Sequence, residues 1–235
     1  MLVVCAFATA AYLAWMALSA VDFLYPWLYG ALNIDAHIER YAPQNRYRHG
    51  FQHTTDTERI ALFGQIVSAV NHDGRGLEAL SYRPGPGRKP IPLLRQPEIE
   101  HLRLVAHLVT RLKHAAWVAT GLLLLTAIAM RVAGARPTRV FRFGAAAVGL
   151  MGAGALIFAS FDVSKSGWFD RLHEWVFPPG HQWFFYYQES LMTTLMKAPD
   201  LFGPIAVALG LLTVVFYALL LVGLRVLLVH GGQRA

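Results

Sequence analysis

The 235-residue chain contains a single cysteine, Cys5, and only 15% of its residues are charged. One cysteine excludes a disulfide framework and a cluster of thiol metal ligands. The sequence also lacks the glycine-rich phosphate loop, the Gly-x-Ser-x-Gly nucleophile turn and the His-Glu-x-x-His zinc motif. No run of lysines and arginines with interleaved aromatic residues is present, so we expect no nucleic-acid partner.

Long apolar runs dominate what is present, since 55% of the residues are hydrophobic. Four runs are long enough to cross a hydrocarbon layer about 30 Å thick as helices that rise about 1.5 Å per residue. We therefore predict an all-α polytopic membrane protein with four transmembrane helices. A signal peptide is the alternative for the first run, but that run lacks a basic start. The predicted spans are residues 2–24, 114–130, 144–161 and 201–229.

The charges indicate how these spans are oriented. Residues 131–143 carry four arginines and no acidic residue, which places them in the cytoplasm by the positive-inside rule. Four spans then put both termini in the cytoplasm and residues 25–113 and 162–200 outside it. The formal charge of +7 divides into +6 inside and +1 outside. The basic composition therefore reflects membrane orientation.

The first outer segment, residues 25–113, is long enough to hold a small domain. Its Thr55-x-x-Glu58 motif is a capping box, which predicts a helix that continues to Val70. Turn-forming residues at 71–76 end this helix.

Further along the same segment, a Pro-Gly-Pro-Gly sequence separates residues 80–83 from residues 89–94. This arrangement predicts a hairpin or an irregular turn. Pro97 then favours the first turn of a new helix, and no helix-breaking residue follows for many turns. We expect one helix from Pro97 to Met130, which enters the membrane as span two.

The second outer segment, residues 162–200, is rich in aromatic rings, which favour the headgroup zone of a bilayer. The two outer segments together hold eight of the ten histidines and every acidic residue except Asp22. We therefore expect the chemistry of the protein on its outer face, above an interfacial aromatic belt.

On the helix that begins at Pro97, His101 has the position of a buried residue. It shares a face with Leu104, Leu108 and Leu112 at helical spacing. Glu98, three residues earlier, can orient its ring or stabilise its charge. A core histidine whose hydrogen bonds are satisfied is the alternative interpretation.

His173 repeats this pattern in the second outer segment. If a short helix begins at Ser166, His173 shares a face with Phe169 and Leu172, and Asp170 lies three residues before it. An acid-x-x-His motif therefore occurs once in each outer segment. Two such histidines that meet under aromatic rings favour a functional site, because histidine transfers protons near neutral pH.

The other histidines have weaker contexts. His107 and His114 fall on the polar arc of their helix, and we expect them to face solvent or headgroups. His49 and His53 are spaced four apart, which is too weak a pattern to predict a metal site. No comparable context surrounds His181.

The two acid-x-x-His blocks resemble those of the bacterial lipoprotein intramolecular transacylase (Lit) family of integral membrane proteins. The matching sequences are Glu-Ile-Glu-His-Leu-Arg-Leu-Val at residues 98–105 and Phe-Asp-Arg-Leu-His-Glu-Trp-Val-Phe-Pro-Pro-Gly at residues 169–180. Members of the family have a similar Glu-x-x-His block entering span two and a similar histidine block before a tryptophan-containing stretch. Leu102 and Leu104 stand where the family has methionine and aspartate.

This resemblance implies a reaction and a location. The family moves an acyl chain within a diacylated lipoprotein, from a glycerol ester to the α-amine of the N-terminal cysteine, and so makes the lyso-form. The resemblance implies a multi-pass protein of the bacterial cytoplasmic (inner) membrane. Its partners would be the diacylated lipoprotein and membrane lipid, and it would need no cofactor.

The residues suit this chemistry. Aminolysis of an ester within one molecule needs proximity and two proton transfers, but no enzyme nucleophile. We expect His101 and His173 to share the base and acid roles, with Glu98 and Asp170 orienting them. Arg103 is a candidate to stabilise the oxyanion or to contact a headgroup.

Two other classes of protein stay open. Paired acid-x-x-His motifs ligate metals in helical bundles, which is typical of metal enzymes and redox proteins, although the spans offer no further carboxylates. A non-enzymatic membrane scaffold or lipid-binding protein, in which the histidines belong to the core, is the second.

Overall fold

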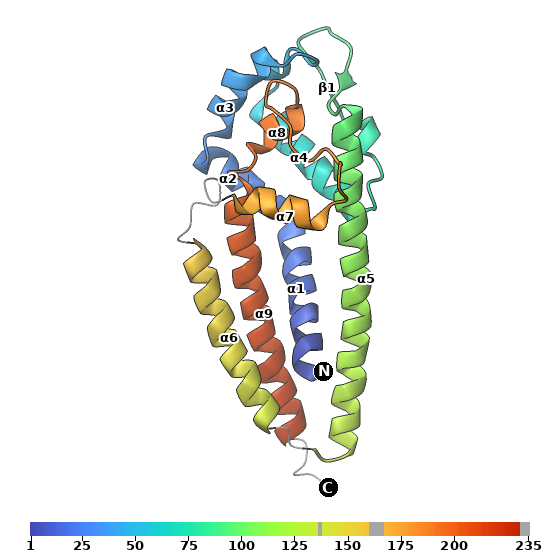
Figure 1. Cartoon of the computed structure of the whole chain (residues 1–235), viewed down its shortest axis with the longest axis vertical. Helices are drawn as coiled ribbons and strands as arrows, with labels where there is room; N and C mark the ends of the chain where they lie inside the picture. The colour runs from blue at the N-terminus through green and yellow to red at the C-terminus, as the bar shows by residue number, and fades with distance from the viewer. Residues whose placement is uncertain (136–137, 160–166, 231–235) are drawn as a thin grey trace. The chain divides into compact units, whose positions relative to one another are not determined.

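A computed structural model of the chain describes residues 1–135, 138–159 and 167–230 (Figure 1). These residues are mostly helical. They belong to two compact units, each made of segments that alternate along the sequence. Unit 1 comprises Met1–Leu18, Arg111–Phe161 and Ala206–Ala235, and unit 2 comprises Ser19–Thr110 and Asp162–Ile205.

Unit 1 is built from long apolar helices. They are α1 (Leu2–Ser19), the second half of α5 (Gln96–Val132), α6 (Thr138–Ala159) and α9 (Phe202–His230). Ala6 and Ala10 of α1, Leu123 of α5 and Tyr217 of α9 are buried in one hydrophobic cluster. Cys5 is buried in the same cluster, with 7% of its surface exposed. Small alanine side chains on α1 allow this close approach of helices.

Three helices in the described part of the chain are long and apolar enough to cross a membrane. They are Leu2–Ser19, Gln96–Val132 and Phe202–Leu228. They correspond to the first, second and fourth predicted spans. The third predicted span, 144–161, overlaps α6, which is not among these three, and its residues 160–161 lie outside the described ranges.

The first helix ends earlier than the sequence predicts. α1 stops at Ser19, whereas the apolar run continues to Leu24. Asp22, Phe23 and Leu24 have φ angles of 48°, 52° and 63°. A left-handed conformation costs about 1–2 kcal/mol for a residue with a side chain, and three in succession break the helix whatever their hydropathy.

Unit 2 begins with α2 (Tyr25–Ala31) and α3 (Ile34–Tyr41), and includes α4 (Asp56–Asn71) and α8 (Leu191–Met196). Tyr25 is fully buried at its centre. Its ring stacks on Phe63 of α4 with centroids 3.9 Å apart, and its hydroxyl donates to the carbonyl oxygen of Leu195 at 2.6 Å. One side chain thus ties α2 to α4 and α8.

Three local predictions for unit 2 are confirmed. The backbone N–H of Glu58 donates to Thr55 Oγ1 at 3.2 Å and the Glu58 carboxylate accepts from the Thr55 backbone, which completes the capping box. β1 (Ser81–Tyr82) pairs antiparallel with β2 (Ile91–Pro92) as a minimal hairpin. α5 is one continuous helix, as predicted from Pro97.

Short 3-10 turns lie at Asp22–Leu24, Ala42–Gln44, Phe51–His53 and Leu77–Ala79.

The first part of α5, up to Thr110, and α7 (Trp168–Val176) also belong to unit 2. Gly167 precedes α7 with φ +66°, a conformation that glycine adopts without steric cost. The start at Ser166 expected from the sequence lies outside the described residues. α7 carries His173, and the loop that follows it leads to α8.

Candidate active site

His101 lies on the first turns of α5 and is buried, with 6% of its surface exposed. The buried stripe of this part of the helix is centred on Ile99, Leu102 and Ala106. Leu112, which was expected to share the face of His101, is 61% exposed. Leu112 belongs to the part of α5 that lies in unit 1.

His173 meets His101 inside unit 2. The centroids of the two imidazole rings lie 5.7 Å apart and the ring planes differ by 25°. The two histidines singled out by the sequence are therefore neighbours, although 72 residues separate them in the chain. Leu172 is 52% exposed, so the predicted face of α7 that included it is wrong.

A third histidine, His181, completes the cluster. Its Nε2 atom lies 3.3 Å from Nδ1 of His101, and the two rings are 5.5 Å apart with planes that differ by 15°. The sequence offered no periodicity to single it out. The available signal was the Pro-Pro-Gly turn before it, in which Gly180 has φ +79° and the backbone N–H of His181 bonds to the carbonyl oxygen of Pro178.

Aromatic rings enclose these imidazoles. The Phe177 centroid lies 5.1 Å from that of His101 and 5.4 Å from that of His173. Trp183 stacks on His173 at 4.8 Å. Phe169 and Phe185 also contact the cluster. Apolar rings around an imidazole lower the local dielectric constant and so strengthen electrostatic interactions between the three histidines.

The orientation of His173 is set by a backbone carbonyl. Its Nδ1 atom lies 2.6 Å from the carbonyl oxygen of Phe169, one turn earlier in α7. A carbonyl oxygen only accepts hydrogen bonds, so Nδ1 carries the proton and Nε2 of the neutral ring keeps its lone pair. Nε2 is therefore the basic atom of His173.

Opposing effects act on the pKa of His173, and burial, the largest of them, leaves that pKa below its ordinary value. Burial lowers its pKa, whereas the hydrogen bond to Phe169 and the negative charge of Asp170 raise it. Asp170 itself is exposed. The expected orienting task is thus performed by the Phe169 carbonyl, and Asp170 acts on His173 through its charge.

His101 is held in the neutral form more strongly. It lies on α5 thirteen residues before the apolar stretch that begins at His114. Burial, with smaller contributions from His173 and His181, lowers the pKa of His101 to about 3. The neutral form of this ring is therefore strongly favoured at neutral pH.

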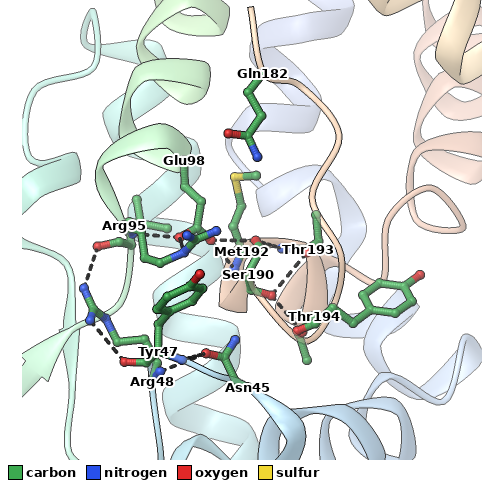
Figure 2. Close-up of polar contacts among 12 residues, drawn as sticks. Asn45, Tyr47, Arg48, Arg95, Glu98, Gln182, Ser190, Met192, Thr193 and Thr194 are labelled. Atoms are coloured by element: carbon green, nitrogen blue, oxygen red, sulfur yellow. Dashed lines mark hydrogen bonds and ion pairs between the residues drawn. The ribbon is translucent and has the colours of Figure 1, made fainter.

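Glu98 has a different task from the one expected. It is fully buried, and one carboxylate oxygen accepts from Ser190 Oγ at 2.6 Å and from the Met192 backbone at 3.1 Å. The other accepts from the Arg95 backbone at 2.7 Å. Figure 2 shows Glu98 between Arg95 and the turn at Ser190. Glu98 thus joins the start of α5 to the start of α8 instead of orienting His101.

Arg103 is also placed differently from the expectation. Its Nη2 atom lies 2.6 Å from a carboxylate oxygen of Glu78. It follows His101 by two positions, so it points to the opposite side of α5. Nearby, Nδ1 of His107 lies 2.8 Å from a carboxylate oxygen of Asp73, and His107 is half-exposed, as predicted. Arg103 and His107 therefore contact acidic side chains on a surface that is separate from the histidine cluster.

His37 is a further buried histidine, and no sequence pattern predicted its burial. His37 of α3 is 9% exposed and its ring lies 4.6 Å from that of Tyr41 and 4.4 Å from that of Tyr187. Burial, followed by the positive charges of Lys197 and Arg40, lowers the pKa of His37 to about 4. Its contacts are those of a packing residue that joins α3 to the segment before α8.

Among the described residues, no group of three or more histidine, cysteine, aspartate or glutamate side chains is arranged to hold a metal ion. The absence of a cofactor stays a prediction.

Comparison with protein-family models, with curated proteins and with solved structures finds no match to the chain. The described residues show a mostly helical protein with three helices long and apolar enough to cross a membrane, and a cluster of three histidines of which His101 is buried.

Proposed function

We propose that the protein is a membrane acyltransferase acting within a diacylated bacterial lipoprotein. It moves an acyl chain from the glycerol ester to the α-amine of the N-terminal cysteine and leaves the lyso-form. The observation that carries the proposal is the pair formed by His101 and His173, whose rings lie 5.7 Å apart in an aromatic enclosure. Two adjacent, oriented imidazoles are what an aminolysis without an enzyme nucleophile requires.

The first proton transfer prepares the amine. The cysteine ammonium loses one proton to Nε2 of His101, since Nδ1 of that ring is occupied by His181. The free amine nitrogen then attacks the ester carbonyl carbon, which forms the C–N bond and a tetrahedral oxyanion. Both reactants belong to one substrate molecule, so binding supplies the proximity.

The second proton transfer completes the exchange. As the C–N bond forms, the attacking nitrogen gives its next proton to Nε2 of His173. The C–O bond to the glyceryl group then breaks, and the same proton passes from His173 to the leaving alkoxide oxygen. His173 suits this two-way role because the Phe169 carbonyl and Asp170 both favour its protonated form while burial opposes it.

The membrane setting follows from the apolar helices. Three candidate spans support a multi-pass protein, and the arginines at 131–143 favour a cytoplasmic side for that segment. We propose four spans in the bacterial cytoplasmic membrane, with both termini inside and the histidines on the extracytoplasmic side. Trp175 and Phe184 are 85% and 54% exposed and suit contact with lipid headgroups and acyl chains.

The test is to express the protein with a diacylated lipoprotein in a host that lacks this activity. Mass spectrometry of the lipoprotein N-terminus reads where the acyl chain lies. We expect the lyso-form with the native protein and the diacyl form with His101→Ala or His173→Ala. His107→Ala is the matched control, because His107 lies on the same helix outside the cluster.

Other outcomes distinguish the remaining classes. An unchanged diacyl form with well-folded native protein would contradict the transacylase proposal. Stoichiometric metal in the purified protein, lost in the His101 variant, would favour a metal enzyme. Loss of stability without any change in a lipid product would favour a scaffold.

A further inference from the structure

The proposed reaction produces one proton in excess, and this inference rests on that reaction. An ammonium and an ester become an amide and an alcohol, so one of the two protons lost by nitrogen is not returned to the products. His173 passes its proton to the leaving oxygen. The proton taken first by His101 must therefore reach water by another route.

His101 cannot store this proton. Its ring is 6% exposed and lies among aromatic rings, so a positive charge there lacks both water and a carboxylate partner within the described contacts. The nearest carboxylate in the sequence, Glu98, already accepts hydrogen bonds from Ser190, Met192 and Arg95. Arg103 is cationic and pairs with Glu78 on the other side of the helix.

We propose that His181 is the proton exit of the site. It is partly exposed, and its Nε2 atom lies at hydrogen-bond distance, 3.3 Å, from Nδ1 of the buried His101. The ring planes differ by 15° and the centroids lie 5.5 Å apart, so the rings meet nearly edge to edge, as a hydrogen bond between two in-plane nitrogen atoms requires.

The relay is balanced for protons and charge. The substrate ammonium gives a proton to Nε2 of His101, and the proton on Nδ1 of His101 moves to Nε2 of His181. The proton on Nδ1 of His181 then leaves to water. Each ring gains one proton and loses one, and both end neutral in the opposite tautomer. Both rings regain their first tautomer after product release, when exchange of their N–H protons with water returns no net proton to the site.

The first experiment needs no lipoprotein. Hydrogen exchange of the His101 imidazole N–H with solvent is measured by nitrogen NMR on selectively labelled protein in detergent. We expect exchange at least tenfold slower in His181→Phe, which keeps a ring in place but carries no proton. Equal rates in native protein and His181→Phe would overturn the relay, whatever the reaction catalysed by the protein.

The second experiment measures turnover in three variants. His181→Gln can still hydrogen-bond to His101 but cannot pass a proton from one ring nitrogen to another. We expect His181→Gln, His181→Phe and His181→Ala to lose turnover by about 100-fold, a loss typical of proton-transfer groups. A positioning role alone would leave His181→Gln active, and that result would overturn the proposal.

Added imidazole gives the most specific readout. We expect imidazole buffer to restore turnover in His181→Ala in proportion to the concentration of its basic form, and to have no effect on His173→Ala. Failure of rescue in a His181→Ala variant with native thermal stability would overturn the relay. If the native protein itself makes no lyso-form, the function proposed above fails, and the exchange rates still decide the His101–His181 path.

Discussion

The Nδ1 atom of His173 and the backbone carbonyl oxygen of Phe169 lie 2.6 Å apart, one turn of α7 from each other. This contact leaves Nε2 as the basic atom of the ring. We predict that His173→Asn, whose amide can keep the bond to the carbonyl, folds like the native protein but loses transacylase turnover by about 10²–10⁴-fold. Native thermal stability together with native turnover in this variant would contradict the assigned role of Nε2.

The pH dependence of turnover offers a second test. Burial holds the pKa of His173 below the ordinary value of 6.5, and the charge of Asp170 opposes that shift. The basic form is the active one, so turnover falls as the pH drops below this pKa. Asp170→Asn removes the opposing charge and should move the acid limb of kcat to lower pH. Glu174→Gln, also on the exposed side of α7, is the control that leaves the limb in place.

The stability of the protein should also depend on pH. His101 and His37 have folded-state pKa values of about 3 and about 4, below the ordinary value of 6.5. Between pH 6.5 and these folded-state pKa values, the unfolded chain binds more protons than the folded chain. The free energy of unfolding therefore decreases as the pH falls below 6.5. We expect thermal unfolding in detergent to show this slope, and His101→Gln to reduce it. If the melting temperatures of the native protein and His101→Gln fell in parallel with pH, His101 would not contribute to the pH dependence of stability.

Glu98 gives a stability prediction. Glu98→Ala leaves the buried Ser190 hydroxyl and the Met192 and Arg95 backbone N–H groups without an acceptor. We expect a loss of roughly 3 kcal/mol, the cost of breaking a buried charged network. Glu100→Ala should change stability by less than about 0.5 kcal/mol because Glu100 is exposed and bonds only to Gln96 among the described contacts. Equal melting temperatures for the two variants would contradict the structural role of Glu98.

Arg103 provides a negative prediction. Its pairing with Glu78 on the other side of α5 places it outside the histidine cluster. Arg103→Ala should therefore keep turnover within about twofold of native, since it is an exposed ion pair worth less than about 1 kcal/mol. A loss of kcat beyond tenfold would restore Arg103 as an oxyanion-stabilising residue.

Much of the site could be predicted because it depends on local patterns. The acid-x-x-His spacing singled out His101 and His173, although helical phase predicted the wrong neighbours at Leu112 and Leu172. The capping box at Thr55 correctly predicted the start of α4. These features depend on residues within one or two helical turns of each other.

The rest depends on contacts between distant residues. Glu98 accepts a hydrogen bond from Ser190, 92 residues away, and no local sequence pattern predicts that partner. His181 follows a Pro-Pro-Gly turn in irregular backbone, where neither helical nor strand periodicity applies. α1 ends because Asp22 and its neighbours take left-handed backbone angles, and hydropathy carries no information about backbone angles.

The lone thiol of Cys5 is packed inside the cluster of α1, α5 and α9. Water-soluble maleimides should therefore leave the native protein unlabelled, and Cys5→Ser provides a background without any thiol. A single cysteine introduced at an exposed position, such as Glu174 or Arg139, then reports on which side of intact cells it lies. Sidedness and the accessibility of the histidine cluster can thus be mapped by labelling, one position at a time.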